Sequence, residues 1–363
     1  MTKATEIWVD RGNLRDAKIV ERELAPLGEG EVLVAIDKYG LTANNVSYAV
    51  SGDFIGYWKY YPAEDKWGKV PVWGFANVVE SNCADVPVGE RLWGFFPMAD
   101  YAVLQPGKIS TRNIHDGAAH RAELPALYNQ YARTSQDEDY LKALETERCL
   151  LFPLFTTSYV LYDYLIDNDF FGAKQVLVGS ASSKTGFGLA HLLFNDSAIS
   201  QKVVGLTSSS NVGFVKDLHV CDQIVAYGKE DEIDSSVPTA FVDMSGDGPL
   251  RTKLHNMLGD LMVESCMVGA THWDVDRSPG DVPGAKPTFF FAPSHIAKRE
   301  ADWGSGVLLQ KAFAANAKIA EDIKGDMTVD NIQGAEDARA IWLDMLNNKI
   351  PPSRGIMVRI LAS

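Results

Sequence analysis

"KQVLVGSASSKTGFGLAHLLF", residues 174–194, determines how the rest of the chain is interpreted. The stretch begins with a short apolar run, which is typical of a strand buried on both faces. A loop rich in Ser and Gly follows, and apolar residues then return at helical spacing. The stretch therefore predicts a strand, a loop and a helix in immediate succession.

The same alternation continues along the chain after residue 194. Strands are expected at 202–207, 222–227, 239–244, 264–270 and 287–292, and helices at 211–218, 249–258, 305–324 and 334–348. Buried strands separated by helices form right-handed βαβ units with a parallel sheet. We therefore expect an α/β protein containing a Rossmann-type, doubly wound parallel sheet, followed by a terminal strand at 355–361.

The first part of the chain has a different pattern. Short β-like runs separated by Gly and Pro turns predict a small, mostly β domain. Residues 115–149 are polar and helix-prone without a strand signal, and we interpret them as a helical insertion or cap. The expected domains are 1–155 for the β domain, 156–322 for the Rossmann-type domain and 323–363 for a return to the first domain.

The composition is that of an ordinary soluble globular protein. The chain has 363 residues, 46% of them hydrophobic and 23% charged, which favours two domains over one. Its formal charge of −14 argues against an extended nucleic-acid surface, because phosphate binding needs clustered Lys and Arg. The sequence shows no apolar signal segment and no run long enough to span a membrane, so we expect a cytoplasmic protein.

Cysteine and histidine spacing gives no indication of a metal site. Cys83, Cys149, Cys221 and Cys266 lie far apart, and the seven histidines are scattered. Neither residue type forms the paired spacing that zinc sites use. We therefore expect reduced structural thiols and no bound metal.

Two familiar motifs fit the loop after Gly179 poorly. A Walker A loop needs a glycine directly before its lysine, but Lys184 and Thr185 come one residue early and follow a serine. A nucleophile elbow, GxSxG, needs a serine two positions after Gly179, where this chain has Ala181.

A variant dinucleotide-binding loop fits better. Gly186 and Gly188 follow a predicted strand and open a helix, which permits close packing of helix on strand. The hydroxyls and amides of the loop would face a diphosphate at the helix N-terminus. The alternative is that the serines only cap the helix. The loop residues that we expect to bind the cofactor are Gly179, Ser180, Ser182, Ser183, Lys184, Thr185 and Gly186.

The end of the next predicted strand favours NADP(H) over NAD(H). In dinucleotide folds this position carries an acidic residue that accepts a hydrogen bond from the adenosine ribose. Here the residues from Thr207 to Asn211 include no Asp or Glu. Hydroxyls from Ser208 and Ser209, with a cation from Lys216 or Lys184, suit a 2′-phosphate.

An ordered series of short motifs resembles the zinc-independent, quinone oxidoreductase-like branch of the medium-chain dehydrogenase/reductase superfamily. The resembling stretches are LGEGEVLVAIDKYGLTANN (27–45), VPVWGFANVVESNCADVPVGERLWGFF (70–96), LFPLFTTSYVLYDYL (151–165), KVVGLTSSSNVGFVKDLHVCDQIVAYGKED (202–231), FVDMSGDG (241–248) and AEDARAIWLDMLNNKIPPSRGIMVRIL (335–361). The resemblance implies a GroES-like, mostly β domain beside the Rossmann-type domain. It also implies hydride transfer from NADPH to a conjugated enone or a quinone.

The chain departs from this family at both of its metal sites. Ala43-Asn44-Asn45 stands where the family has its catalytic cysteine, and Phe75 and Ala76 replace the usual acidic ligand. The four-cysteine lobe is also absent. The resemblance therefore implies metal-free chemistry, in which the protein orients the substrate and stabilises a developing enolate.

Aromatic residues near Asn44 and Asn45 predict a site for flat, hydrophobic carbonyl compounds, although most of them would equally suit a β-domain core. Tyr48 is the first candidate for donating a proton or hydrogen bond to the reduced oxygen, and Tyr57 is the second. Asn44 and Asn45 would bind substrate or nicotinamide ribose, with simple turn formation as the alternative.

The remaining cofactor candidates come from the resemblance and from strand ends. Thr157 resembles a cofactor-facing hydroxyl, and Tyr227 resembles an adenosine contact. Gly246, Gly269 and Phe291 lie at or near the ends of predicted strands, where close backbone approach to the cofactor is expected.

Two other functions stay open at this stage. The chain could be a catalytically silent NADPH-binding protein of the same fold, or a nucleotide-dependent phosphotransferase that uses the SSKT segment, residues 182–185. The expected partner is a small carbonyl substrate, with neither nucleic acid nor membrane involved. The family resemblance adds a possible homodimer through the sheet edge at 265–270 and 288–292.

Overall fold

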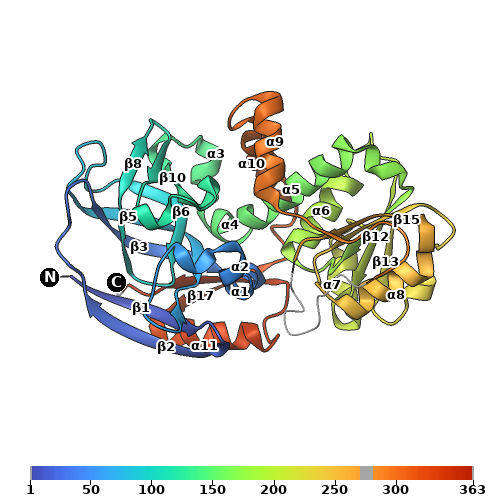
Figure 1. Cartoon of the computed structure of the whole chain (residues 1–363), viewed down its shortest axis with the longest axis horizontal. Helices are drawn as coiled ribbons and strands as arrows, with labels where there is room; N and C mark the ends of the chain where they lie inside the picture. The colour runs from blue at the N-terminus through green and yellow to red at the C-terminus, as the bar shows by residue number, and fades with distance from the viewer. Residues whose placement is uncertain (1, 270–280, 362–363) are drawn as a thin grey trace. The chain divides into compact units, whose positions relative to one another are not determined.

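The computed structural model describes residues 2–269 and 281–361 of the chain. The chain forms two compact units (Figure 1). The first unit comprises Met1–Leu150 and Thr328–Ser363, and the second comprises Leu151–Met327. The chain therefore leaves the first unit once, builds the second, and returns.

The second unit contains a parallel sheet of six strands in the order β13-β12-β11-β14-β15-β16. This order, 3-2-1-4-5-6 along the chain, is that of the Rossmann fold, which confirms the expected fold class. The strands are β11 (Gln175–Gly179), β12 (Lys202–Thr207), β13 (Gln223–Ala226), β14 (Thr239–Asp243), β15 (Met262–Met267) and β16 (Thr288–Phe289). Of the sheet edge predicted for a homodimer, Ala270 lies outside the described residues.

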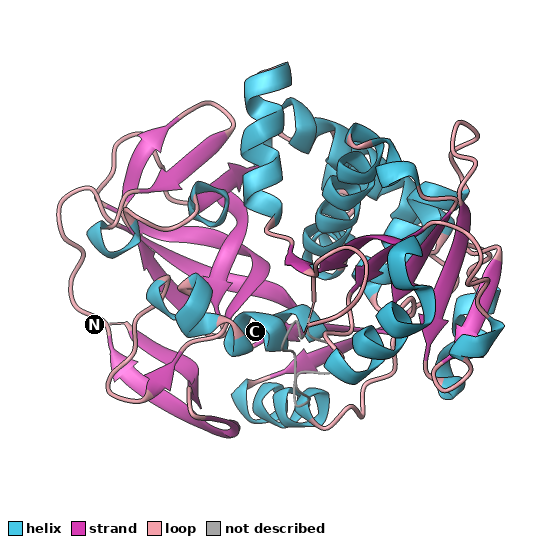
Figure 2. Ribbon diagram, turned by 45° about the vertical axis from the view of Figure 1, so that its right-hand side comes forward, coloured by secondary structure: helices cyan, strands magenta, loops and turns pink. Residues whose placement is uncertain are grey.

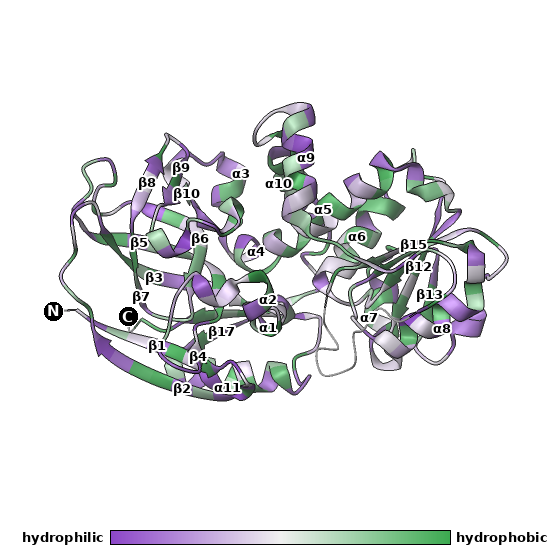
Figure 3. Ribbon diagram, viewed as in Figure 1, coloured by the Kyte–Doolittle hydropathy of each residue, from purple (hydrophilic) through white to green (hydrophobic). Residues whose placement is uncertain are grey.

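Helices lie on both faces of this sheet (Figure 2). They are α5 (Phe152–Asp167), α6 (Lys184–Phe194), α7 (Val212–Asp217), α8 (Gly248–Leu258), α9 (Ala292–Trp303) and α10 (Val307–Asp322). Figure 3 shows the strands mostly in the hydrophobic colour, as expected for strands covered on both sides. On one face, Leu177, Val204 and Phe241 pack in one buried cluster with Leu250 and Leu254 of α8.

The first unit is mostly β, as expected. A three-stranded sheet has the order β2-β1-β4, and a larger one runs β17-β18-β3-β5-β6-β10-β9-β8, with β7 paired to β3. The strands are β1 (Lys3–Asp10), β2 (Asn13–Glu23), β3 (Val32–Leu41), β4 (Trp67–Gly68), β5 (Pro71–Ser81), β6 (Arg91–Pro97), β7 (Tyr101–Leu104), β8 (Pro106–Ile109), β9 (Asn113–Asp116), β10 (Gln130–Arg133), β17 (Thr328–Gln333) and β18 (Arg354–Arg359).

Short helices complete the first unit. They are α1 (Ala43–Val50), α2 (Gly52–Ile55), α3 (Asp139–Lys142), α4 (Glu145–Leu150) and α11 (Ala335–Leu346). The helix α11 packs against β1, β2 and β17, and the indole of Trp342 donates a hydrogen bond to the carbonyl of Leu14 at 2.9 Å. The returning end of the chain is therefore anchored in the first unit.

The segment 115–149 differs from the expectation of a region without strands. It contributes β10, which pairs with both β6 and β9 and so extends the large sheet. The strand is only four residues long, and of these only Tyr131 is fully buried. So short and polar a strand carries no recognisable alternation in sequence, because its neighbours in the sheet stabilise it rather than its own residues.

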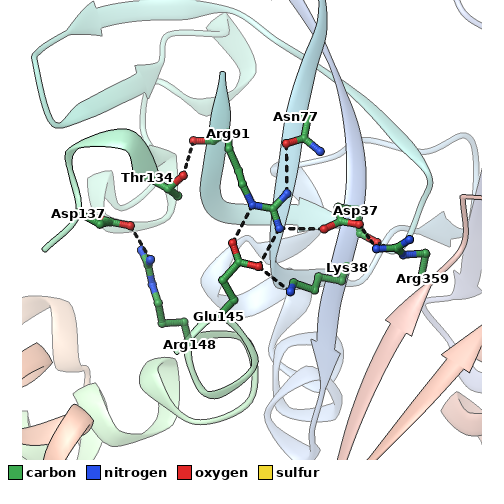
Figure 4. A network of polar contacts seen from close by, with 9 residues as sticks. All are labelled: Asp37, Lys38, Asn77, Arg91, Thr134, Asp137, Glu145, Arg148 and Arg359. Atoms are coloured by element: carbon green, nitrogen blue, oxygen red, sulfur yellow. Dashed lines mark hydrogen bonds and ion pairs between the residues drawn. The ribbon is translucent and has the colours of Figure 1, made fainter. Parts of the chain in front are cut away.

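A network of ion pairs holds α4 against the large sheet (Figure 4). Arg91 of β6 binds both oxygens of Glu145, at 2.7 and 2.9 Å, and Asp37 of β3 at 2.8 Å. Lys38 adds a second cation to Glu145 at 2.5 Å. Burial raises the pKa of Glu145, but the hydrogen bonds from Arg91 and Lys38 outweigh it and bring the pKa down to about 2.

We expect Arg91→Met to destabilise the protein by about 2–4 kcal/mol, because it leaves two partly buried carboxylates without their main partner. The ion pair also makes stability depend on acid. The pKa of Glu145 is depressed in the folded state, so its contribution is complete above an unfolded pKa of 4.5 and is lost as the pH falls toward 2. Urea unfolding at several pH values measures both effects. In Glu145→Gln this part of the acid dependence should be absent; an unchanged pH profile would contradict the assignment.

Candidate cofactor and substrate sites

The loop between β11 and α6 has the geometry of an anion-binding helix start. Ser183 caps α6, and its hydroxyl accepts a hydrogen bond from the amide of Gly186 at 3.1 Å. The first turn of a helix leaves amides without an intrahelical acceptor and carries a partial positive charge. Ser180 turns the chain sharply out of β11 with φ of 53°, in the left-handed region.

Two glycines permit the close packing of this loop. A Cβ at Gly186 would lie 2.4 Å from the carbonyl oxygen of Ser180, which is too close for any side chain. A Cβ at Gly188 would lie 2.7 Å from atoms of both Phe155 and Ser158 on α5. Gly186 therefore closes the loop, whereas Gly188 packs helix against helix rather than helix against strand as expected.

The Ser182 side chain joins the loop between β11 and α6, which we call the phosphate loop, to the end of β12. Its buried oxygen accepts hydrogen bonds from the Thr207 hydroxyl at 3.0 Å and the Asn211 amide at 3.2 Å. Beyond β12, Ser208 and Ser210 hydrogen-bond each other at 3.0 Å, and Ser209 is exposed. The structure thus brings the two predicted halves of the cofactor site together.

Tyr227, which follows β13, contacts the loop after β11. Its hydroxyl accepts a hydrogen bond from the amide of Ser180 at 2.9 Å. This residue, expected to contact adenosine, stabilises the strained turn after β11. Sequence reasoning did not assign this role, because nothing in the sequence pairs residue 227 with residue 180.

The two lysines proposed for phosphate binding lie in different positions. Lys184 is half-buried at the first residue of α6, and burial lowers the pKa of its ammonium group to about 8. A cation there opposes the positive end of the helix dipole, so both effects disfavour its charge unless an anion is bound. Lys216 is exposed in the last turn of α7, about 7.5 Å along the helix from Asn211 by helical rise.

The remaining cofactor candidates are spread around the strand ends. Gly246 has φ of 71° and donates its amide to the carboxylate of Asp243 at 3.1 Å. A Cβ at Gly269 would lie 2.5 Å from the carbonyl oxygen of Met244, so this position needs glycine for backbone packing. No hydrogen bond among the described residues links Phe291, the residue that caps α9, to the loop.

Thr157 and Thr185 lie on neighbouring helices. The hydroxyl of Thr157 donates to the carbonyl of Pro153 at 3.2 Å, as hydroxyls in helices commonly do. The adjacent Ser158 donates to the carbonyl of Thr185 at 2.8 Å and so holds α5 against the start of α6.

The first unit contains a cluster of aromatic side chains around Tyr48. Its ring lies 4.6 Å from that of Tyr57 and 5.3 Å from that of Phe95. The Tyr48 oxygen accepts a hydrogen bond from the indole of Trp73 at 3.1 Å. Burial raises the pKa of Tyr48, and the side chains of Trp73 and Asn44 act in the opposite direction. Because Trp73 is a donor, the hydroxyl proton of Tyr48 is left for some other acceptor.

Asn45 has a structural role. Its side-chain oxygen accepts a hydrogen bond from the Thr42 amide at 2.7 Å, and its side-chain nitrogen donates to the Pro71 carbonyl at 2.9 Å. The residue is buried and forms a capping box that starts α1. The turn-forming alternative considered for Asn45 therefore describes it better than a substrate contact.

Tyr128 is a member of the cluster that sequence reasoning did not select. Its hydroxyl lies 3.0 Å from that of Tyr57, and both rings are buried. Burial raises the pKa of Tyr48, Tyr57 and Tyr128, so all three hydroxyls stay protonated and can donate at physiological pH. The only available signal was an aromatic residue inside a polar segment.

Two searches of the described residues gave negative results. Within 2–269 and 281–361, no three His, Cys, Asp or Glu side chains are grouped so that they could hold a metal ion. Of the helices formed by these residues, none combines the length and apolar character needed to cross a membrane.

Comparison with known proteins gives a family model and similar folds. The model for a protein of unknown function (DUF2855) matches residues 39–351, and no curated protein matches the sequence. CurA from Vibrio vulnificus, solved in complex with NADPH, is 12% identical, with a TM-score of 0.60 over 99% of this chain and 100% of that one.

Two further structures resemble the chain over almost its whole length. The quinone oxidoreductase from Coxiella burnetii is 13% identical, with a TM-score of 0.55 over 99% of this chain and 100% of that one. The yhdH oxidoreductase from Salmonella enterica, in complex with NADP, is 14% identical, with a TM-score of 0.53 over the same shares. These likenesses show that the chain shares its fold with these three proteins, in agreement with the expected resemblance.

Proposed function

The chain belongs to the DUF2855 family of proteins of unknown function, and we propose that it is a metal-free, NADP(H)-dependent oxidoreductase acting on conjugated enones or quinone-like compounds. The observation that carries this proposal is the phosphate loop, in which Ser183 caps α6 and Ser182 joins the loop to the end of β12. Rossmann folds hold a dinucleotide with this order of elements. Three similarly folded proteins support the proposal: two are named as oxidoreductases, and two were solved with NADPH or NADP bound.

The residues of the loop fit a dinucleotide. A diphosphate can approach the start of α6 closely, because Gly186 has no side chain and the hydroxyl of Ser183 is turned back to cap the helix. Lys184 would neutralise the charge of the 2′-phosphate, which offsets the cost of a half-buried ammonium at a helix N-terminus. Bound NADPH would supply a hydride for an electron-poor carbon of the substrate.

The end of β12 supports NADPH over NADH. The residues from Thr207 to Asn211 carry hydroxyls and an amide but no carboxylate, so nothing there would repel a 2′-phosphate. Ser182 orients both Thr207 and Asn211, which fixes the polar groups at this strand end before any ligand binds.

The first unit would supply the substrate side of the reaction. Tyr48 is our proposed donor to the substrate oxygen, because its own oxygen already accepts a hydrogen bond from Trp73 and its proton is free to donate. Donation of this proton, or of a hydrogen bond, stabilises negative charge that develops on oxygen as hydride adds to the conjugated carbon.

We expect NADPH to bind at least about tenfold more tightly than NADH, and Lys184→Met to narrow this gap by about 1–3 kcal/mol, the scale of a charged hydrogen bond. Fluorescence titration with each nucleotide measures the two Kd values in the wild type and in the variant. Lys216→Met tests the other cation expected near the 2′-phosphate, which is exposed in the last turn of α7. Equal affinity for the two nucleotides in the wild type would exclude a 2′-phosphate site.

The contribution of Lys184 should also depend on pH. With a pKa of about 8 in the free protein, its ammonium is charged at pH 7 and loses its proton above pH 8. A bound phosphate favours the charged form, so NADPH binding takes up a proton and weakens as the pH rises above 8. Lys184→Arg should flatten this dependence.

Oxidation of NADPH in the presence of simple enones and quinones tests the activity itself. NADPH binding without turnover on any of them would favour the silent NADPH-binding alternative. ATP binding without NADPH binding would favour a phosphotransferase instead.

A further inference from the structure

Phe95 of β6 contacts two pairs of buried tyrosines. The two pairs differ in whether every hydroxyl proton has an acceptor among the described residues. In the first pair, the hydroxyl oxygens of Tyr61 and Tyr131 lie 2.9 Å apart. Both hydroxyls are also within donating distance of the Phe95 carbonyl oxygen, at 2.7 and 2.9 Å. Arg121 donates to the Tyr131 oxygen at 3.0 Å and is itself paired with Asp116. Every polar group of this first pair therefore has a protein partner.

The second pair, Tyr57 and Tyr128, has fewer partners. Their hydroxyls lie 3.0 Å apart, so one donates to the other. The hydroxyl that accepts this bond keeps a proton of its own, and no other residue among those described provides an acceptor for it. The proton of Tyr48 is in the same situation, since its oxygen accepts a hydrogen bond from Trp73 and no described residue accepts one from it.

The hydroxyl protons that lack an acceptor belong to neighbouring rings. The rings of Tyr48 and Tyr128 lie 6.2 Å apart, and those of Tyr57 and Tyr128 lie 5.4 Å apart. Burial raises the pKa of Tyr48, so its hydroxyl keeps its proton. A buried hydroxyl proton without an acceptor is unfavourable. Two such protons in one cluster therefore point to a ligand that supplies the acceptor.

We propose that the Tyr57–Tyr128 pair supplies a second hydroxyl donor beside Tyr48, and that together they bind one carbonyl oxygen as it becomes anionic. This inference rests on the proposed function and extends it. Tyr128 is a positioning residue in this arrangement, because its hydroxyl fixes the direction of the Tyr57 proton. The segment 115–149 is then part of the substrate site rather than a surface elaboration.

Two donors on one oxygen define the class of ligand. They favour an oxygen that carries or develops negative charge, such as an enolate, a reduced quinone or a phenolate, over an ether or an alcohol. The surrounding rings of Phe95 and Trp73, 4.8 and 6.1 Å from that of Tyr128, favour a flat ligand.

Binding of 4-nitrophenol, followed by its absorbance, tests the donors without turnover. The wild type should bind the phenolate more tightly than the neutral phenol and so lower the probe's apparent pKa. Tyr128→Phe and Tyr57→Phe should each weaken phenolate binding by about tenfold, and the double variant should be no worse than Tyr57→Phe alone. Additive losses in the double variant would show that Tyr128 does not act through Tyr57.

Tyr61→Phe is the matched control, because it removes a buried hydroxyl whose bonds all end within the protein. It should lower thermal stability and leave phenolate binding unchanged. Equal losses in Tyr61→Phe and Tyr128→Phe would overturn the inference. Failure of the wild type to oxidise NADPH, with phenolate binding intact, would instead count against the proposed function alone.

Discussion

Tyr48→Phe lowers the kcat of enone or quinone reduction by about 10²–10³-fold and leaves the Kd for NADPH unchanged: this is the largest effect that we expect on turnover. Removing one donor from a preorganised oxyanion site typically costs this much. The loss should be in kcat rather than KM, because the bond strengthens only as charge develops on the substrate oxygen. Stopped-flow measurement of NADPH oxidation in a single turnover isolates this step.

Tyr39→Phe is the control for Tyr48→Phe. Tyr39 is also a fully buried phenol of the first unit, but its hydroxyl has no hydrogen-bond partner among the described residues. Its removal should leave turnover intact and keep or raise stability, since an unsatisfied buried hydroxyl is lost. A Tyr48→Phe enzyme as active as wild type would reject Tyr48 as the donor.

The sequence was most informative where one element repeats a simple pattern. The strands of the second unit are continuous apolar runs, because helices cover both faces of the sheet, and their order follows from right-handed βαβ connections. The absence of an acidic residue after β12 could likewise be seen directly. The helix α9 was missed, because its run APSHIAKREADW is mostly polar and begins at Ala292, inside the apolar run 287–292 that was predicted as a strand.

Long-range hydrogen bonds could not be predicted in this way. Ser182 was selected as a phosphate contact, but its bonds to Thr207 and Asn211 depend on the folded position of β12. The pairing of Tyr57 with Tyr128 spans 71 residues and requires β10 to extend the sheet. Local patterns identify elements, whereas such contacts depend on the tertiary arrangement.

Gly186→Ala should weaken NADPH binding by at least about 30-fold, or 2 kcal/mol. The added Cβ would lie 2.4 Å from the Ser180 carbonyl oxygen and 2.9 Å from the Ser183 oxygen. The backbone of Ser180 must move, since it has no flexible end that could give way, and the Ser183 cap moves with it. Isothermal titration with NADPH measures the loss, which should affect NADH equally because the diphosphate is common to both.

Gly213→Ala separates loop distortion from a general effect of changing a glycine. Gly213 lies on α7 of the same unit, and a Cβ there would meet nothing within 4 Å. This variant should bind NADPH normally and be more stable by about 0.5–1 kcal/mol, because Ala restricts the unfolded chain and favours helix. Normal NADPH affinity in a folded Gly186→Ala protein would mean that the diphosphate does not rest on this loop.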